Sequence, residues 1–318
     1  VVNQPGNYTI TVRNATNGCT ASATVTVTAN TTLPTAVAGP PQTITCAVTN
    51  ATLNGTGSSS GPNFTYQWTA GAGGSIVNGA NSLNPVVSTP ATYTLIVTNT
   101  TNGCTQSSNV AVTLNNTPPT AIIAPPGKLT CTISQVTLNG SASPTGGSYA
   151  YQWTTLNGNV QSGQASQNAV VTEEGDYTLI VTNTQNGCTG SATVFVDLDF
   201  TDPAAVIVVN QQITCNNPTV TLDGTGSSSG PGYNFYWTAT AGGNIVSGQN
   251  TLMPTVNAPG SYSIIVTNLV NNCTASASVL VTQNITPPIV NPGEPGTLTC
   301  DLPQIQLGDP ATIVLPNI

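Results

Sequence analysis

The chain has 318 residues and few charges: two basic side chains, ten acidic ones and no histidine, which give a formal net charge of -8 at pH 7 and a pI near 4.1. Nucleic-acid binding needs clustered Lys and Arg, and the common hydrolytic triads need an imidazole base, so we expect neither a nucleic-acid partner nor an enzyme. No apolar run reaches the roughly 18 residues of a membrane helix, so we expect no membrane span.

The first predicted element starts at Tyr8, where the phrase YTITVRNATNGCT predicts two strands joined by a turn. Close variants of this phrase return at Tyr93, Tyr177 and Tyr262. Other markers keep the same spacing of 84 or 85 residues: the tryptophans Trp68, Trp153 and Trp237, and two series of cysteines, Cys19, Cys104, Cys188, Cys273 and Cys46, Cys131, Cys215, Cys300. A constant period of this kind indicates a tandem array of one structural unit.

Alignment of the cysteines divides the chain into three whole units and two partial ones. Val1 aligns with Val86, so residues 1–32 supply only the last strands of a β-sandwich. The whole units are expected at 33–117, 118–201 and 202–286, and residues 287–318 supply only the first strands of a further sandwich.

Within each unit, apolar residues alternate with Thr, Ser and Asn. In order, the first whole unit reads as a Pro-containing linker, QTITC, ATLNGTGS, a Gly/Ser turn, FTYQW, a looser stretch, YTLIVTN and SSNVAVTL. Alternation with a period of two, many β-branched residues and frequent turn signals predict antiparallel strands, and no segment shows the helical period. We therefore expect an all-β fold of tandem antiparallel β-sandwiches in an elongated array.

Large aromatic residues are the predicted core anchors of each sandwich. We expect the tryptophans of the third strand to point inward, although an aromatic row of this kind could instead stack against sugars; these residues are Trp68, Trp153 and Trp237. Tyr8, Tyr177 and Tyr262 each follow a turn (PGNY, EGDY and PGSY), which is typical of a tyrosine corner, and Tyr93 occupies the same place in its unit.

The repeated phrase PGxYTxxVTNxxNGCT, preceded by QTITC and TLNGTGSSSGPNFTYQW, resembles the PKD-type or Ig-like repeats of very large bacterial cell-surface and secreted proteins, especially those of Bacteroidota. The resemblance covers essentially the whole chain. It implies a β-sandwich fold, and it is compatible with spacers, stalks, adhesin shafts and enzyme appendages, so it is less informative about function.

The eight cysteines indicate an oxidising, extracytoplasmic location, and two pairing schemes preserve the repeat. The first closes a loop inside each unit: Cys46–Cys104, Cys131–Cys188 and Cys215–Cys273. It is favoured because most repeat modules carry their own disulfide. The second joins neighbouring units, for example Cys46 with Cys188, and it stays open because the two cysteines of one unit could lie at opposite ends of the sandwich.

The partial units at the two ends allow two interpretations. The chain could be a window cut from a longer repeat protein, because half sandwiches leave strand edges unpaired. Alternatively, the tail of one copy could complete the head of the next, giving an open head-to-tail filament. In that case Cys19 and Cys300 would be intersubunit cysteines, and the apolar segment Ala311–Pro316 could stand in for the missing Trp strand.

Asp197, Asp199 and Asp202 lie together at the expected junction of the second and third units. Their oxygen ligands could bind calcium and rigidify the junction, or they could simply be solvated acids on a linker. No other cofactor is expected.

These features predict an extracellular or cell-surface structural protein, a rod, stalk or filament shaft whose partners are other copies of itself or neighbouring repeats of a longer chain. An adhesin or carbohydrate-binding array that recognises surface glycans is the alternative.

Overall fold

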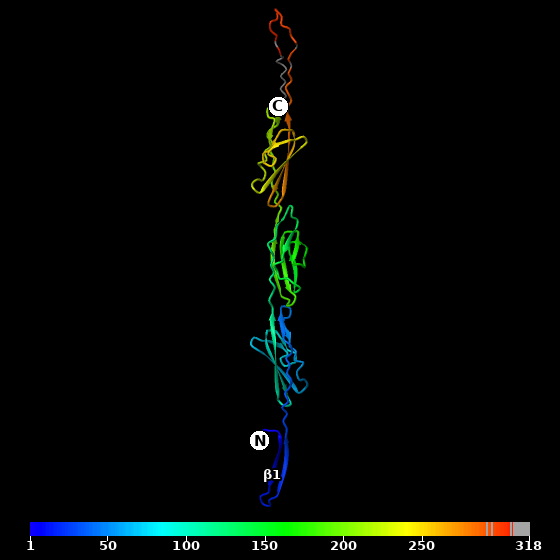
Figure 1. Cartoon of the computed structure of the whole chain (residues 1–318), viewed down its shortest axis with the longest axis vertical. Helices are drawn as coiled ribbons and strands as arrows, with labels where there is room; N and C mark the ends of the chain where they lie inside the picture. The colour runs from blue at the N-terminus through cyan, green and yellow to red at the C-terminus, as the bar shows by residue number, and fades with distance from the viewer. Residues whose placement is uncertain (291, 294, 306, 308–318) are drawn as a thin grey trace. The chain divides into compact units, whose positions relative to one another are not determined.

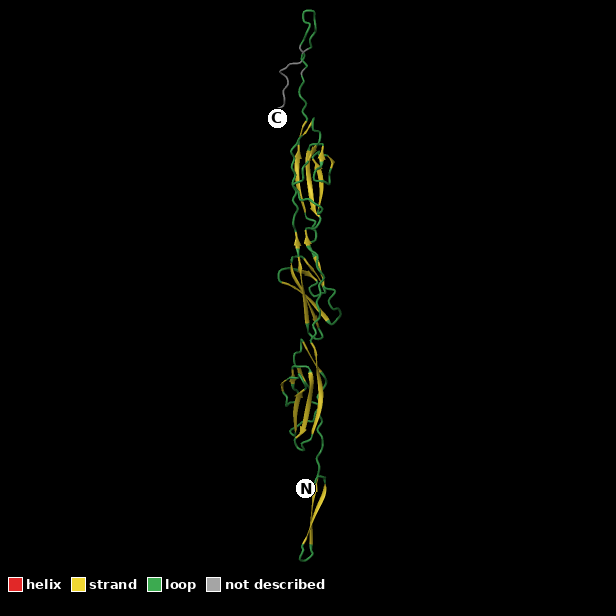
Figure 2. Ribbon diagram, turned by 90° about the vertical axis from the view of Figure 1, so that its left-hand side faces the viewer, coloured by secondary structure: helices red, strands yellow, loops and turns green. Residues whose placement is uncertain are grey.

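The computed structural model describes residues 1–290, 292–293, 295–305 and 307. Every regular element in this part of the chain is a β-strand, as Figure 2 shows, so the expected all-β fold is confirmed. No helix in the described residues is long and apolar enough to cross a membrane. Two compact units are present, one comprising Val1–Pro126, Thr137–Val171 and Asp176–Phe195, and the other Gly127–Val136, Thr172–Gly175 and the described residues from Val196 onward.

The first element is a β-hairpin, blue in Figure 1, made of β1 (Gly6–Arg13) and β2 (Thr20–Val27). The two strands pair antiparallel along their full length, from Gly6 with Val27 to Arg13 with Thr20. They form a two-stranded sheet of their own. This hairpin occupies the segment in which the cysteine alignment predicted the last strands of a sandwich.

The first whole repeat consists of two sheets. The larger sheet has the order β3-β9-β8-β5 and the smaller has the order β4-β7-β6. β3 and β9 run parallel, while β8 is antiparallel to both β9 and β5. The strands are β3 (Gln42–Thr45), β4 (Ala51–Thr52), β5 (Phe64–Ala70), β6 (Ile76–Asn78), β7 (Val86–Val87), β8 (Ala91–Asn99) and β9 (Thr105–Asn115).

The next two repeats keep this arrangement, except that the long strand β9 is replaced by two shorter strands. In the second repeat the sheets are β12-β15-β16, β11-β14-β13 and the parallel pair β10-β17, and in the third they are β20-β23-β24, β19-β22-β21 and the parallel pair β18-β25. The strands of the second repeat are β10 (Leu129–Thr130), β11 (Val136–Asn139), β12 (Tyr149–Thr155), β13 (Val160–Ser162), β14 (Asn168–Val171), β15 (Gly175–Asn183), β16 (Thr189–Val196) and β17 (Leu198–Asp199). Those of the third are β18 (Ile213–Thr214), β19 (Val220–Thr221), β20 (Tyr233–Thr240), β21 (Ile245–Ser247), β22 (Thr255–Val256), β23 (Gly260–Asn268), β24 (Thr274–Val281) and β25 (Gln283–Asn284).

The alternation in the sequence explains which face of each strand is buried. In β8, Tyr93, Leu95 and Val97 are completely buried, whereas the residues between them are half-exposed. On outer faces, hydroxyl side chains pair across strands, for example Ser263 Oγ with Ser278 Oγ at 2.7 Å. Successive side chains of a strand point to opposite faces, so this pattern places one face in the core and one in solvent.

The predicted aromatic anchors of the three whole repeats lie in their cores, whereas Tyr8, on the hairpin β1–β2, is only half-buried. The three tryptophans are buried, and each indole Nε1 donates to a backbone carbonyl of the loop that crosses above it: Trp68 to Ser82, Trp153 to Ser166 and Trp237 to Thr251. This burial leaves no open ring face, so the sugar-stacking interpretation is wrong for these residues. Burial of each ring contributes about 2–3 kcal/mol to the free energy of unfolding.

The tyrosine hydroxyls tie the start of the long hairpin to the preceding turn. Three of them donate to the carbonyl four residues earlier: Tyr8 to Gln4 at 2.8 Å, Tyr93 to Thr89 at 2.8 Å and Tyr262 to Ala258 at 2.6 Å. The Tyr177 hydroxyl accepts from the Asn159 backbone N–H at 3.0 Å, as the Tyr93 and Tyr262 hydroxyls do from Ser75 and Asn244. The positions are those of a tyrosine corner.

The described residues after Asn284 form no strand, although the sequence predicted the first strands of a sandwich there. In the whole repeats the corresponding first strand pairs with the end of the long hairpin of its own repeat, as β3 pairs with β9. Among the described residues after Asn284 no hairpin offers such a strand. The segment Ala311–Pro316 lies outside the described residues.

Candidate functional site: the joints between repeats

The tip of the long hairpin has the same structure in all four copies. An Asn two residues before the hairpin cysteine accepts the cysteine backbone N–H with its side-chain oxygen, at 2.9–3.1 Å. The residue between them has positive φ, and it is Gly in three copies and Asn272 in the fourth. The four Asn–Cys pairs are Asn17–Cys19, Asn102–Cys104, Asn186–Cys188 and Asn271–Cys273. This tight turn fixes the direction of the cysteine side chain.

The other series of cysteines also lies in a turn that recurs four times. The threonine before each cysteine accepts the backbone N–H of the residue three positions later with its hydroxyl, and its own N–H donates to the carbonyl of that residue. The turns run from Thr45 to Val48, from Thr130 to Ile133, from Thr214 to Asn217 and from Thr299 to Leu302. We call them the Thr-Cys turns.

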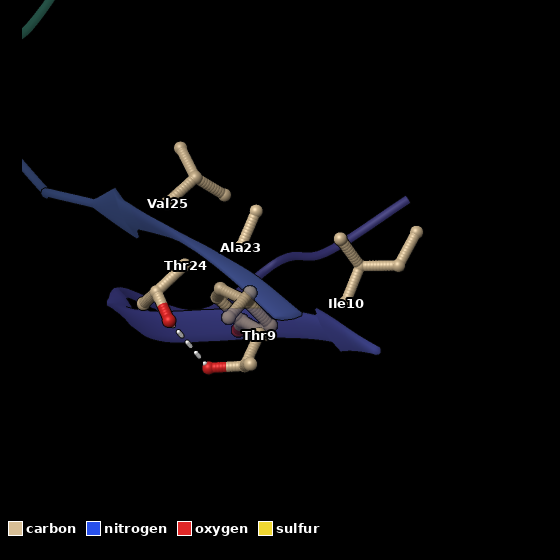
Figure 3. A pocket seen from close by; sticks show the side chains of 6 residues that line it. Thr9, Ile10, Ala23, Thr24 and Val25 are labelled. Carbon is tan, nitrogen blue, oxygen red and sulfur yellow. Dashed lines mark hydrogen bonds between the residues drawn. The ribbon is translucent and has the colours of Figure 1, made fainter. Parts of the chain in front are cut away.

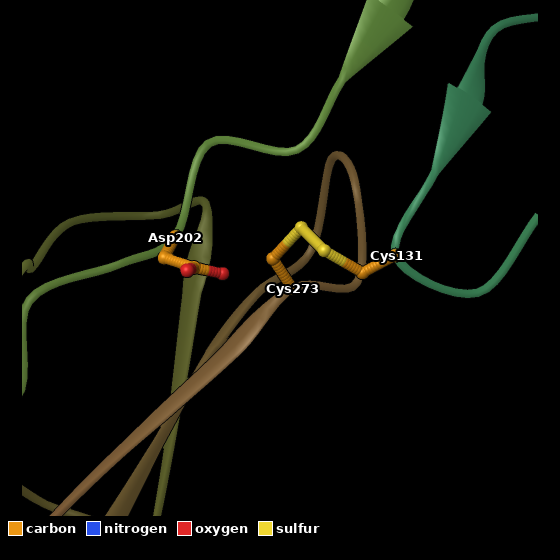
Figure 4. A group of neighbouring side chains, drawn as sticks. All are labelled: Cys131, Asp202 and Cys273. Atoms are coloured by element: carbon orange, nitrogen blue, oxygen red, sulfur yellow. A yellow bond between two sulfur atoms is a disulfide. The ribbon is translucent and has the colours of Figure 1, made fainter. Parts of the chain in front are cut away.

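Two disulfides join a Thr-Cys turn of one repeat to the hairpin tip of the following repeat. Cys46 is bonded to Cys188, with Cα atoms 5.0 Å apart, and Cys131 is bonded to Cys273, with Cα atoms 5.1 Å apart (Figure 4). Each bond closes a span of 142 residues. In the chain-entropy model a loop of that size stabilises the folded state by about 5 kcal/mol.

The favoured pairing within each repeat is therefore wrong. Cys46 follows Thr45, which pairs with Asn115 at the end of β9, whereas Cys104 precedes Thr105 at its start. A strand of eleven residues spans about 30 Å, far beyond the Cα separation of a disulfide. The pairs Cys46–Cys104, Cys131–Cys188 and Cys215–Cys273 are all absent, and Cys104 and Cys215 are free, as are Cys19 and Cys300.

The tip asparagine also binds the linker that enters its repeat. Asn186 Nδ2 donates to Asn115 Oδ1 at 3.0 Å and to the Thr117 carbonyl at 3.2 Å. The same two bonds are made by Asn271 to Asp199 and Thr201, and by Asn102 to Asn30 and Thr32. Asn186 and Asn271 are buried, so their amides are fully used at the joint. We call this contact the asparagine latch; it was not predicted, although the Asn-x-Cys spacing repeats four times in the sequence.

Close packing completes the joint beside Cys188. The Ala47 backbone N–H donates to the Asn186 carbonyl at 3.2 Å. A Cβ atom added to Gly187 would lie 2.5 Å from the Ala47 Cβ, so the residue at this place must be small. Gly187 has φ of +71°, which glycine adopts without strain.

The three aspartates at the second joint do not form the predicted calcium site. Asp197 forms an ion pair with Lys128 at 2.5 Å, and Asp199 accepts from Asn271 Nδ2 at 2.9 Å. Asp202 lies beside the Cys131–Cys273 disulfide (Figure 4). Among the described residues, the group whose ligand atoms lie within 4.8 Å of one another consists of Cys131, Asp202 and Cys273. The two cysteine sulfur atoms of this group are already bonded to each other in a disulfide. Among the described residues the three carboxylates therefore do not form one ligand group.

Hydrogen bonds and charge set the ionisation of these acids. The pKa of Asp199 is lowered mainly by the hydrogen bond from Asn271, and next by the Thr201 backbone N–H. The pKa of Asp197 is lowered mainly by its hydrogen bond with Lys128, and the same contact raises the pKa of Lys128. Both side chains of the ion pair are solvent-accessible, so the pair contributes little to stability.

The hairpin β1–β2 exposes a face that is buried in the whole repeats. Ile10 and Val12 are 67% and 62% exposed, whereas Leu95 and Val97, at the same places in the first whole repeat, are fully buried. Figure 3 shows the hollow on this hairpin, which is lined by Tyr8, Thr9, Ile10, Ala23, Thr24 and Val25. An unpartnered apolar face of this kind is typical of a surface that receives another segment.

Residues 203–287, which cover the third repeat, match the family of Ig-like domains described as CHU_C associated. The chain is 29% identical over 278 residues to the mouse dyslexia-associated protein KIAA0319 homolog, and 31% identical over 262 residues to the mouse KIAA0319-like protein. These alignments cover 77% and 74% of this chain but only 26% and 25% of the relatives, so the chain spans about a quarter of their length.

Two solved structures are also similar to parts of the chain. The titin I-band fragment I67–I69 is 12% identical with a TM-score of 0.36, over 79% of this chain and 98% of the fragment. The PKD domain of the KIAA 1837 protein is 29% identical with a TM-score of 0.22, over 26% of this chain and 89% of that domain. The family match at 203–287 and the sheet order shared with the other two repeats support the expected resemblance to Ig-like repeats.

Proposed function

We propose that this protein is a non-enzymatic structural array of the extracellular surface, in which tandem β-sandwiches hold a distance and resist extension. The observation that supports this most strongly is the joint between the first two whole repeats, where a disulfide, an asparagine latch and a small-residue contact tie one repeat to the next. A disulfide and an asparagine latch recur at the joint to the third repeat. Disulfides of this kind persist in oxidising compartments. The motif resemblance described above suggests a bacterial cell surface, and we extend that location to this chain.

Single-molecule stretching tests this role. In the oxidised chain, the 142-residue spans closed by Cys46–Cys188 and Cys131–Cys273 do not extend, so the contour length released on unfolding is short. In a Cys46→Ser/Cys131→Ser variant, the same spans are released and the contour length increases by hundreds of ångströms, at roughly 3.5 Å per residue. Equal contour lengths for the two proteins would contradict the proposed mechanical role of the joints.

We also propose that copies assemble head to tail, the tail of one copy completing the hairpin β1–β2 of the next. Leu298 and Leu307 occupy the places of Ile44 and Leu53 in the repeat, and these are 61% and 75% exposed in the tail but 5% and 1% exposed in the whole repeat. The tail therefore presents the apolar side chains that the bare face of the hairpin lacks. Burial of such side chains is the main driving force for association.

Sedimentation of the isolated chain under reducing conditions tests head-to-tail assembly. We expect association that increases with concentration and is lost in an Ile10→Asp/Val25→Asp variant, which places charge on the bare face of the hairpin. Both side chains are already exposed, so the charge should not unfold the whole repeats. A monomer at all concentrations would contradict assembly and would favour neighbouring repeats of a longer chain as the partner, leaving the structural role intact.

A carbohydrate-binding array is a second candidate, supported by one observation. Tyr236 is 51% exposed on β20, and it lines a surface hollow with Asn234, Phe235, Asn250 and Thr267. An exposed aromatic ring with amide neighbours is suited to a sugar. A glycan array compared with a Tyr236→Ala variant tests this idea: binding that depends on Tyr236 would support it, and the absence of binding would leave the structural role alone.

A further inference from the structure

The free cysteines divide equally between the two halves of the joint. Cys19 and Cys104 lie at hairpin tips, and Cys215 and Cys300 lie in Thr-Cys turns. In both closed joints a Thr-Cys turn bonds to the hairpin tip of the repeat that follows it. Two of the four free thiols therefore lie at hairpin tips and two lie in Thr-Cys turns, and these are the two kinds of site that each closed disulfide joins.

Each free thiol is held in the geometry of its bonded counterparts. The Asn17 and Asn102 side chains accept the backbone N–H of Cys19 and Cys104 at 3.1 and 2.9 Å, compared with 2.9 and 3.0 Å for the two bonded tips. The turn at Cys300 has the Thr299 N–H to Leu302 carbonyl bond at 3.1 Å, compared with 2.9 Å for the turn at the bonded Cys46. The local structure of both halves thus forms without the disulfide.

The tip at Cys104 is a joint with one component missing. Its asparagine latch is closed, because Asn102 Nδ2 donates to Asn30 and Thr32. Its outer surface is uncovered: a Cβ at Gly103 would meet nothing within 4 Å, whereas one at Gly187 would meet Ala47. Cys104 is only half-buried, while Cys188 and Cys273 are 1% and 0% exposed. At the two closed joints a Thr-Cys turn occupies this place.

We propose that, in the head-to-tail assembly described above, Cys300 of one copy forms a disulfide with Cys104 of the next copy, and Cys215 of the first copy forms one with Cys19 of the next. One placement of the second copy satisfies both bonds, because Cys19 and Cys104 are 85 residues apart, as are Cys215 and Cys300. This inference rests on the proposed head-to-tail assembly.

The same geometry excludes a bond between Cys19 of one copy and Cys300 of another. In the completed repeat these two cysteines would occupy the places of Cys104 and Cys46, which lie at opposite ends of β9. Each subunit contact would instead carry two disulfides. All eight cysteines of a copy inside the filament would then be oxidised.

The bond-forming step is a thiol–disulfide exchange with an oxidised low-molecular-weight disulfide such as oxidised glutathione. A thiolate of one copy attacks the reagent and releases one reduced thiol, and the thiolate of the other copy then displaces the second. Two cysteine thiols lose two protons and two electrons in total, and one disulfide reagent is reduced to two thiols.

A mixing experiment tests the pairing. A Cys19→Ser/Cys104→Ser chain keeps only the free thiols of the turns, and a Cys215→Ser/Cys300→Ser chain keeps only those of the tips. In glutathione redox buffer we expect each variant alone to run as a monomer on a non-reducing gel, the mixture to give a covalent dimer and nothing larger, and the wild type to give a ladder. The ladder should be lost on reduction.

Peptide mapping identifies the bonds in the dimer. Trypsin is unsuitable because it cuts only after Arg13 and Lys128. The Cys46–Cys188 bond within a copy and both bonds between copies would then join the same two fragments, 14–128 and 129–318. Peptic digestion at acid pH avoids this problem and suppresses exchange. We expect linked peptides containing Cys104 with Cys300 and Cys19 with Cys215, beside Cys46 with Cys188.

Other outcomes overturn the proposal. Covalent dimers of either variant alone, or a Cys19–Cys300 peptide from the wild type, would show a different pairing. Association in reducing buffer without any cross-linking in oxidising buffer would refute the pairing while leaving head-to-tail assembly intact. Absence of both would refute the assembly and the pairing together.

Discussion

Cys46 and Cys188 are separated by 142 residues in the chain, yet their Cα atoms lie 5.0 Å apart across the joint between two repeats. The bond therefore acts on the connection between β-sandwiches and leaves each core to be held by its own aromatic anchors. A repeat protein stapled in this way resists separation of neighbouring repeats as well as their unfolding.

Removal of this disulfide should weaken the joint. We expect a Cys46→Ser/Cys188→Ser variant to unfold at lower temperature, because the unfolded state regains the entropy of the open loop; the chain-entropy model sets the loss at up to about 5 kcal/mol. Differential scanning calorimetry in the absence of reductant measures it. Cys104→Ser is the matched control, since it removes a free thiol at the same place in another repeat, and an equal loss in both would contradict the account.

The asparagine latch predicts a large effect at a single position. Asn186→Ala removes two side-chain donors and the acceptor of the Cys188 N–H at a buried site. We expect the free energy of unfolding to fall by about 2–4 kcal/mol. Each hydrogen bond contributes roughly 1 kcal/mol, and a buried group that is left unpaired costs more. Denaturant unfolding followed by tryptophan fluorescence measures this loss.

Asn17→Ala is the control for that variant. Asn17 is exposed and its side chain makes the bond to the Cys19 N–H at its own hairpin tip. The Asn17→Ala variant should lose less than about 1 kcal/mol of its free energy of unfolding. Similar losses at Asn17 and Asn186 would mean that the contact with the linker contributes nothing.

Two glycines separate backbone strain from packing at the joint. Gly187 and Gly103 have φ of +71° and +74°, but only Gly187 has Ala47 against it. Gly103→Ala should cost about 1–2 kcal/mol from the left-handed conformation alone. Gly187→Ala should cost clearly more, because Ala47 must move away, and thermal melts of the two variants measure the difference. Equal melting temperatures would contradict the packing described at this joint.

The second joint should lose stability in acid. Asp199 accepts hydrogen bonds from Asn271 and Thr201, so its folded pKa is below the ordinary value of 3.8. A depressed carboxyl pKa contributes stability that is fully present above the unfolded pKa and is lost as the pH falls through the folded pKa. We therefore expect the melting temperature to fall below about pH 4.

Asp199→Asn tests the cause of this pH dependence. The first joint has Asn115 at the same place, and its side-chain oxygen accepts the hydrogen bond from Asn186 Nδ2. An amide does not titrate in this pH range. The variant should remain folded and should show a smaller fall in melting temperature between neutral pH and about pH 3. An unchanged pH profile would show that other carboxyls are responsible.

The strands and the core could be predicted from the sequence, because both follow from local patterns. Alternation places Tyr93, Leu95 and Val97 on one face, and the spacing of the tryptophans identifies the third strand of each sandwich. The disulfide pairing could not be predicted in this way. It depends on β3 running parallel to β9, which puts Cys46 at the far end of that strand from Cys104, and sequence spacing alone does not give strand direction.

The acidic cluster shows a second limit of prediction from sequence. Asp197, Asp199 and Asp202 are close in the chain, but each carboxylate meets a different neighbour: Lys128, Asn271 and the Cys131–Cys273 disulfide. The asparagine latch was missed for the opposite reason: its members are about 70 residues apart, and only the repeated Asn-x-Cys spacing marks one of them.

Disulfide mapping of the oxidised monomer under acidic, non-reducing conditions tests the central claim most directly. The account predicts linked peptides containing Cys46 with Cys188 and Cys131 with Cys273. Peptides linking Cys46 with Cys104 and Cys131 with Cys188 would show that each repeat closes on itself, and would contradict the account of covalent joints.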